Sequence, residues 1–232
     1  MRLKKRMKFI IISVLSVIVV LTTTFFIYVS DYYKADDFAV QTMKTSEIRT
    51  VGNLTVLSPS TPSEKGVIFY PGAKVEETAY LPLLEKLCQN GITCVLVKMP
   101  FHLAVFNTNA ANDVFEKLPE IKQWYIAGHS LGGAMASGYA SKHQDIINGL
   151  ILLGAYVYSD VPIDNTVTIY GSEDTVLNKS KINYTKNIFV IEGGNHAQFG
   201  NYGEQKGDGK ATITANEQQG KAAEIILSFI NK

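Results

Sequence analysis

Residues 122–140 read KQWYIAGHSLGGAMASGYA, and this stretch decides the fold. An apolar run typical of a strand stops at Gly128, and a run of small residues typical of a helix begins after Ser130. Gly128, Ser130 and Gly132 have the G-x-S-x-G spacing of a nucleophile elbow, a turn so tight that the positions two residues from the serine must lack a side chain. An ordinary glycine-rich turn is the alternative, but the strand before and the helix after favour the elbow.

The same turn predicts a site that stabilises negative charge. The backbone N–H of Leu131 and the positive end of the following helix would point to where an oxyanion forms. A second N–H donor is expected from the loop after the apolar run at residues 66–70, and Ala73 is the best candidate. A plain turn is the alternative for that loop.

Length, composition and charge narrow the kinds of protein that this chain can be. The chain has 232 residues, 46% of them apolar, which suits one domain with a sizeable core plus a tail. The net charge is +1, but five basic residues precede Phe9 and the other 17 basic and 21 acidic residues give −4. The globular part therefore shows no basic face for nucleic acid. No metal-binding cluster or phosphate loop is present in the sequence, so no cofactor is expected.

Residues 9–29 form an uncharged apolar run of roughly 31 Å as a helix, close to the thickness of a bilayer core. A cleavable signal peptide has a shorter apolar region and ends in small residues, whereas this run ends in bulky ones. An uncleaved anchor over residues 1–30 is favoured over secretion after cleavage. The basic cluster before the run predicts a cytoplasmic N-terminus, with the catalytic domain on the outer side of the cytoplasmic membrane.

Residues 31–45 lack a clear period and are expected to be a linker, so the compact domain should span residues 46–232. Two cysteines, Cys88 and Cys94, would lie in an oxidising compartment. A disulfide between them is open, although two buried unpaired thiols are the simpler expectation because a bridge needs strict geometry.

Within residues 46–232, apolar runs that suit buried strands alternate with segments of helical period, which predicts a mainly parallel sheet covered on both faces. Ligands of such sheets bind at the carboxyl ends of the strands. The expected strands are residues 66–70, 92–99, 123–127, 148–153, 166–170 and 187–191, after a strand or hairpin at 47–58; helices are expected near 80–88, 112–118, 130–143 and 216–230.

A serine nucleophile needs a histidine base, and the base needs a carboxylate. Of four histidines, His196 follows the strand at 187–191 in a glycine-rich loop that could turn its ring back to the sheet. His129 adjoins the serine and should point away from its hydroxyl; His143 ends a helix in a polar run. His102 could line the pocket, but a loop histidine is the simpler interpretation.

The acid is expected at Asp174, directly after the strand at 166–170. Glu173 is a close competitor, and Asp160 and Asp164 are more distant ones. Asp208 follows the histidine, which would break the chain order of serine, acid and base.

With strand, elbow, acid and histidine in this order, residues 46–232 resemble a serine-type α/β-hydrolase. The segments YPGAKV at 70–75, KMP at 98–100, GHSLGG at 128–133 and NHAQFGNYG at 195–203 are similar to a small bacterial branch near the dienelactone-hydrolase-like proteins. The resemblance implies Ser130, Asp174 and His196 as nucleophile, acid and base, and Leu131 and Ala73 as oxyanion donors.

Two departures limit what the resemblance implies. Dienelactone hydrolases proper use a cysteine nucleophile, so their substrate does not transfer to this serine protein. Many lipases carry a long cap after the sixth strand, whereas only residues 154–165 separate the strands here, which implies a minimal cap and a largely open site. The polar loop at 200–210 is expected either to form a rim beside His196 or to be disordered.

The sequence therefore predicts a membrane-anchored serine hydrolase, a carboxylesterase working through an acyl-enzyme on a small ester or lipid-like substrate. Two alternatives stay open: an acyltransferase of the cell envelope on the same fold, and an anchored binding module without catalysis. Substrate identity and oligomeric state lie beyond the sequence.

Overall fold

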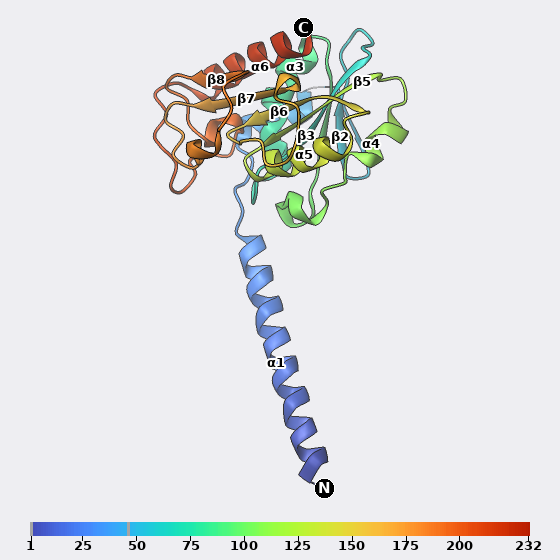
Figure 1. Ribbon diagram of the computed structural model, residues 1–232, viewed down its shortest axis with the longest axis vertical. Coiled ribbons are helices and arrows are strands. Elements are labelled where there is room, and N and C mark those ends of the chain that lie inside the picture. Colours follow the sequence, from blue (N-terminus) through green and yellow to red (C-terminus); the bar gives the residue numbers. More distant parts are fainter. Residues whose placement is uncertain (1, 46) are drawn as a thin grey trace. The chain divides into compact units, whose positions relative to one another are not determined.

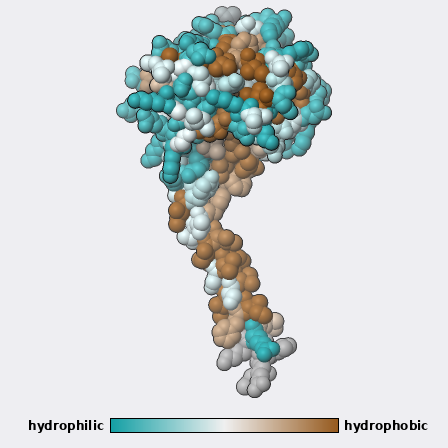
Figure 2. Space-filling model, turned by 60° about the vertical axis from the view of Figure 1, so that its left-hand side comes forward, coloured by the Kyte–Doolittle hydropathy of each residue, from teal (hydrophilic) through white to brown (hydrophobic). Residues whose placement is uncertain are grey.

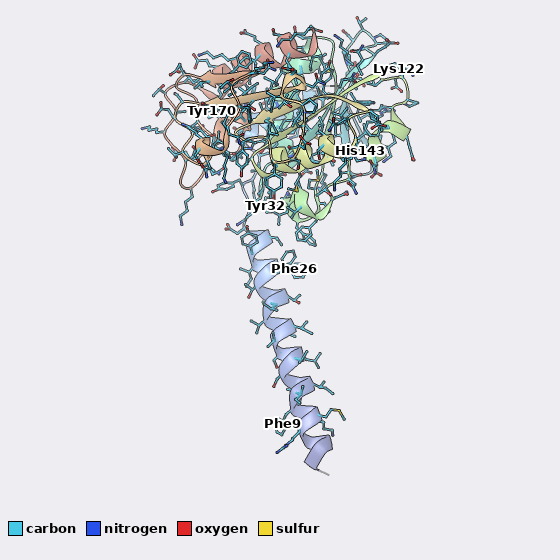
Figure 3. All side chains as sticks on the ribbon, in the orientation of Figure 1. Phe9, Phe26, Tyr32, Lys122, His143 and Tyr170 are labelled. Carbon is cyan, nitrogen blue, oxygen red and sulfur yellow. The ribbon has the colours of Figure 1, made fainter. Side chains whose placement is uncertain are left out.

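The computed structural model describes residues 2–45 and 47–232, and gives side chains from residue 6 onward except at 45 and 46. The chain divides into two compact units, residues 1–32 and residues 33–232. The first unit consists of helix α1 (Arg2–Ser30), whose side chains, among them Phe9 and Phe26, project from the helix (Figure 3). Hydrophobic residues cover most of α1 (Figure 2), and Arg6–Ser30 is long and apolar enough to cross a membrane. A signal sequence would share these properties.

The second unit is built on one eight-stranded sheet in the order β1-β2-β4-β3-β5-β6-β7-β8 (Figure 1). The β1–β2 and β2–β4 pairs are antiparallel, and all other pairs are parallel. The predicted strands are confirmed with small shifts in their ends. The strands are β1 (Ile48–Val51), β2 (Leu54–Leu57), β3 (Lys65–Tyr70), β4 (Thr93–Val97), β5 (Gln123–His129), β6 (Ile147–Leu153), β7 (Thr166–Gly171) and β8 (Ile188–Ile191).

Helices cover both faces of this sheet and make two hydrophobic cores. In β3, Val67 and Phe69 enter one core while Ile68 and Tyr70 enter the other, as the two-residue period of a strand requires. Helices α3 (Leu81–Gln89) and α6 (Ala215–Ile230) pack into the first core, and α4 (Asn112–Lys117) and α5 (Leu131–Lys142) into the second. The α/β fold with a mainly parallel sheet is therefore confirmed.

The segment before β1 differs from the expected linker over residues 31–45. The N–H of Tyr33 donates to Lys74 O at 2.7 Å, which adds an isolated β-bridge between Tyr33 and Val75. Residues Asp37–Thr45 form helix α2, begun by Asp36, whose carboxylate accepts the N–H of Ala39 at 2.9 Å. Among the side chains described at 37–44, only those of Ala39 and Thr42 are deeply buried, too few to give a visible hydrophobic period.

Two further expectations concern the cysteines and the cap. Cys94 is buried in β4 and Cys88 lies on α3, and both are free thiols. Residues 154–165, between β6 and β7, contain one short 3-10 helix, Ile163–Asn165, and no added domain. The carboxyl ends of β3, β5, β6, β7 and β8 are thus left without a large cover.

Helix α6 is fixed at its start by a reciprocal cap. The Thr214 hydroxyl accepts the N–H of Glu217 at 3.2 Å, and Glu217 accepts the N–H of Thr214 at 2.8 Å. Replacing Thr214 by alanine should lower the free energy of unfolding by about 1 kcal/mol. Urea denaturation of the full chain in detergent measures this, and Thr214→Ser, which keeps the oxygen, should stay near wild type. Equal stability of the two variants would contradict the assigned cap.

Candidate active site

Ser130 lies in the turn between β5 and α5, where the sequence places the elbow. Its backbone has φ 53° and ψ −122°, a conformation that costs a residue with a side chain on the order of 1–3 kcal/mol. The N–H of Ser130 donates to Leu153 O at 3.0 Å, which ties the turn to the end of β6. The hydroxyl is presented at the first turn of a twelve-residue helix.

The glycine at position 132 is required by close packing. A Cβ at Gly132 would collide with the backbone carbonyls of Tyr70 and Pro71 at the end of β3. Helix α5 therefore starts in direct contact with the segment that leads into residues 71–74. This contact brings the two predicted oxyanion loops together.

His196 and Asp174 form a buried pair beside this turn. Each is 1% exposed, and His196 Nδ1 lies 2.8 Å from Asp174 Oδ2. The other carboxylate oxygen accepts the N–H groups of Val176 at 3.0 Å and Leu177 at 2.8 Å. Because an ionised carboxylate only accepts, Nδ1 carries the hydrogen and Nε2 of His196 is left as an acceptor.

Space for this pair comes from Gly154, which follows β6 with φ 51°. A Cβ there would lie 2.8 Å from His196 Nδ1 and 3.3 Å from Asp174 Oδ2. A side chain at position 154 would therefore require the imidazole of His196 to shift.

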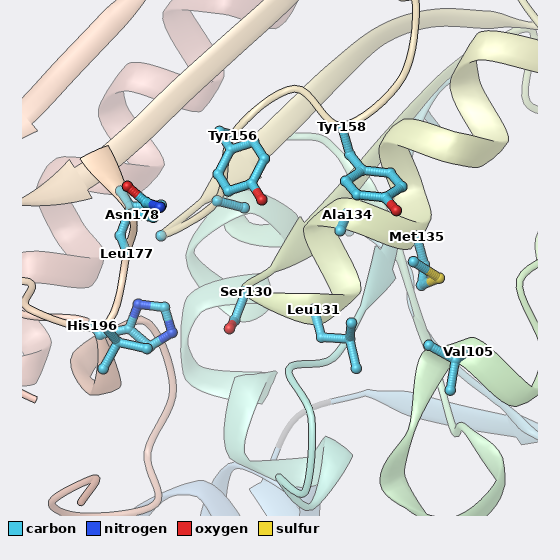
Figure 4. Close-up of a pocket in the computed structure, with 13 residues that line it drawn as sticks. Val105, Ser130, Leu131, Ala134, Met135, Tyr156, Tyr158, Leu177, Asn178 and His196 are labelled. Atoms are coloured by element: carbon cyan, nitrogen blue, oxygen red, sulfur yellow. The ribbon is translucent and has the colours of Figure 1, made fainter. Parts of the chain in front are cut away.

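Ser130 and His196 line the same pocket, of about 560 Å³ (Figure 4). Figure 4 shows the His196 ring and the Ser130 side chain next to each other on one side of it. Within the described residues, Nε2 of His196 is buried without a hydrogen-bond partner. Hydrogen bonds between a catalytic base and its nucleophile are often long in ligand-free enzymes and shorten when substrate binds. The other lining residues are Val105, Leu131, Ala134, Met135, Gly154, Ala155, Tyr156, Tyr158, Val176, Leu177 and Asn178.

The predicted oxyanion donors are the backbone N–H groups of Ala73 and Leu131. The N–H groups on either side of Ala73 already donate hydrogen bonds within the protein. Gly72 N–H donates to the Tyr80 hydroxyl at 3.0 Å, and Lys74 N–H donates to His102 O at 2.8 Å. Among residues 2–45 and 47–232, no hydrogen bond is recorded from the N–H of Ala73 or of Leu131. Both N–H groups are thus available to a ligand.

A buried tyrosine that the sequence did not single out connects these parts. The Tyr80 hydroxyl, which accepts from Gly72, lies 2.8 Å from His129 Nδ1 and can donate its own hydrogen there. The His129 ring lies 4.5 Å from the ring of His196. Burial and the neighbouring His196 lower the pKa of His129 well below its usual value. His129 is therefore neutral and adds no positive charge beneath His196.

A second unpredicted group, Asp208, holds the loops that carry Asp174 and His196. Asp208 Oδ2 accepts the N–H of Ala197 at 2.9 Å, and Oδ1 accepts the N–H of Thr175 at 3.4 Å. Each of these residues directly follows one member of the buried pair. Through Asp208, the loop at 200–210 contacts both the loop after β7 and the loop after β8.

Helix α6 is hydrogen-bonded to the loop that contains His196. The buried Gln218 side chain accepts the N–H of Asn195 at 2.9 Å and donates to Asn195 O at 2.7 Å. The Asn195 side chain in turn donates to Gly209 O at 2.8 Å. The residue before His196 is thus fixed by both of its backbone polar groups.

The remaining candidates lie apart from the pocket. His102 Nδ1 is 3.7 Å from Glu77, and His143 stacks on Tyr139 with ring centroids 3.9 Å apart. Of the competing acids, Asp164 pairs with Lys186 at the surface, and Glu173 and Asp160 are exposed. None of these acids contacts His196 through a recorded hydrogen bond. In the described part of the chain, no group of three metal-ligating side chains comes together.

Comparisons with solved structures find the same fold at low sequence identity. Est1E from Butyrivibrio proteoclasticus is 18% identical with a TM-score of 0.57, covering 80% of this chain and 98% of its own. A dienelactone hydrolase from Anabaena variabilis is 15% identical with a TM-score of 0.55, covering 80% and 97%. TT1662 from Thermus thermophilus is 12% identical with a TM-score of 0.55, covering 80% and 99%.

No curated protein matches the sequence. The profile of the alpha/beta hydrolase family matches residues 66–220, which include the elbow, the buried pair and the loop of Asp208. This match covers well over half of the chain. The chain belongs to the alpha/beta hydrolase family.

Proposed function

We propose that this hydrolase is a serine carboxylesterase with Ser130 as nucleophile, His196 as base and Asp174 as acid. The observation that carries the proposal is the buried pair of His196 and Asp174, 2.8 Å apart, whose His196 lines the same pocket as Ser130. A serine hydroxyl needs a positioned base, and the base needs a carboxylate that fixes its tautomer and stabilises its charged form.

In the proposed reaction, His196 Nε2 takes the Ser130 proton while Oγ attacks the ester carbonyl carbon. The N–H groups of Leu131 and Ala73 hold the oxyanion, aided by the positive end of α5. The imidazolium then gives its proton to the departing alkoxide and leaves an acyl-enzyme. His196 next takes a proton from water as the water oxygen attacks the acyl carbon, and it returns that proton to Ser130 Oγ as the bond from Oγ to carbon breaks and the acid is released.

The ester as substrate is supported by two of the structural neighbours. Est1E has been solved with ferulic acid bound, and another neighbour is a dienelactone hydrolase. The neutral state of His129 also supports the mechanism, because a cation 4.5 Å away would oppose the positive charge that His196 must take up.

We also propose that α1 is an uncleaved membrane anchor, with residues 9–29 in the bilayer and the hydrolase unit outside the cytoplasmic membrane. Its length, its uncharged apolar composition and the basic residues that precede it support this orientation.

Replacing Ser130 by alanine should lower kcat by about 10⁶-fold, and His196→Ala should do the same, because the two residues act as one unit. Asp174→Asn should lower kcat by about 10⁴-fold through the wrong imidazole tautomer. Hydrolysis of a short p-nitrophenyl ester measures these effects. His143→Ala, at a histidine away from the pocket, is the matched control and should retain activity. Fluorophosphonate labelling that survives in Ser130→Ala would overturn the nucleophile.

Asp208 should act as a positioning residue, since it bonds the backbone beside both His196 and Asp174 without lining the pocket. Asp208→Ala should lower kcat by about 10- to 100-fold through misplacement of the base, with KM little changed. Glu204→Ala, which removes an exposed carboxylate from the same loop, is the control. Equal kcat values for the two variants would show that the bridge does not position the pair.

The anchor is tested by membrane fractionation. The full chain should stay in the membrane pellet after alkaline carbonate extraction, and a chain lacking residues 2–30 should be soluble. Protease added to intact spheroplasts should digest the hydrolase unit. If the expressed full-length protein is instead recovered from the medium without its N-terminal segment, that segment is a cleaved signal peptide.

A further inference from the structure

The pocket extends from Ser130 in two directions (Figure 4). Leu177 and Asn178 lie on the side of His196. Leu131, Met135 and Val105 lie on the opposite side, toward α5. The two directions can therefore hold the two halves of an ester.

The proposed chemistry assigns the two sides. His196 must protonate the departing alkoxide, so the alcohol oxygen has to lie toward Nε2. The acyl carbon, bonded to Ser130, then carries its chain away from His196. The acyl chain thus enters the side formed by Leu131, Met135 and Val105.

This side continues beyond the active-site pocket. A second hollow of about 230 Å³ shares Ala134, Met135 and Tyr158 with the first, and continues to Gly138 and Lys142. These positions of α5 follow helical spacing, so they lie along one face of the helix. The two hollows are neighbours with Met135 and Tyr158 in the lining of both, and together we call them the groove along α5.

The groove has room because α5 carries small residues there. A Cβ at Gly138 would meet only the Ser159 hydroxyl, at 3.8 Å. From Leu131 to Gly138 the helix rises about 10 Å, which sets the length available to a chain before it reaches that glycine.

The opposite wall is fixed before substrate arrives. The hydroxyl of Ser137, fully buried on α5, accepts the N–H groups of Tyr158 at 3.0 Å and Ser159 at 3.1 Å. Residues 158 and 159 are thereby tied to the helix that forms the floor. A groove held in this way binds a chain without first having to order its own wall.

The lining favours an uncharged chain. The first hollow is lined mainly by aliphatic, aromatic and small side chains, with the uncharged Asn178 and with His196 as its titratable group apart from the tyrosine hydroxyls. The second hollow adds the uncharged polar side chains of Thr108, Asn109 and Ser159. The one ammonium group on the groove, that of Lys142, lies at the far end and is exposed. Burying a carboxylate or an ammonium in the first hollow would be costly, whereas each buried methylene gains about 0.8 kcal/mol.

We propose that the groove along α5 binds the aliphatic acyl chain of medium- and long-chain esters, with Met135 and Gly138 at successive distances from Ser130. This inference rests on the proposed esterase function and adds the substrate class. Wild-type kcat/KM should rise from acetate to octanoate to dodecanoate esters of p-nitrophenol, measured on the full chain in lipid nanodiscs.

Two tryptophan substitutions should shorten the groove at different points. Gly138→Trp should lower the ratio of kcat/KM for the dodecanoate ester to kcat/KM for the acetate ester at least about tenfold, because several methylene contacts are lost. Met135→Trp should also lower kcat/KM for the octanoate ester relative to the acetate ester. Gly220→Trp, at a glycine of α6 with no atoms near its Cβ position, is the matched control and should keep the wild-type ratio.

The acetate ester reports whether each variant is folded, so the ratio of long to short esters carries the result. An unchanged ratio in both groove variants would overturn the proposal, as would a change that follows the alcohol part of the ester. Failure of the esterase function is distinct: the wild type would then turn over none of the esters and Ser130 would not be labelled by a fluorophosphonate.

Discussion

The packing of the first turn of α5 against the end of β3 is the constraint on which the site depends. Gly132 contacts the carbonyls of Tyr70 and Pro71, so no side chain fits at that position. The contact holds Ser130 at φ 53° and sets the following N–H groups beside the loop that contains Ala73. Strain of on the order of 1–3 kcal/mol at one residue is thereby supported by the sheet and the helix together.

The other half of the site depends on polar side chains that hold the loops after β7 and β8. Apart from the short 3-10 helices Lys179–Lys181 and Ala197–Phe199, these loops have no regular structure, and hydrogen bonds to the half-buried Asp208 and the buried Gln218 hold them. Hydrogen-bond networks of this kind specify one arrangement when every member is satisfied. The open face, by contrast, is mainly apolar beside Ser130 and becomes more polar along α5, so the surfaces proposed to orient His196 and to select the substrate are different ones.

The sequence predicted the strands and the elbow because their signals are local: apolar runs, and glycines two residues from a serine. It also predicted that Asp174 and His196 follow adjacent strands, and the structure pairs them. It could not predict helix α2, which buries too few side chains to show a period. Nor could it predict the contacts of Tyr80 with His129, or of Asp208 with both loops, because these join residues far apart in the chain. The only signal for Asp208 was its place in a polar, glycine-rich loop.

The central claim is that Ser130 Oγ, Nε2 of His196 and the two backbone donors meet around one carbonyl carbon. A crystal structure of the hydrolase inactivated by an alkyl fluorophosphonate tests this most directly. We expect a covalent bond from Ser130 Oγ to phosphorus, a phosphoryl oxygen within hydrogen-bond distance of the Leu131 and Ala73 N–H groups, and the imidazole of His196 beside Oγ. A phosphonyl group on another residue, or one whose oxygen points away from both N–H groups, would contradict it.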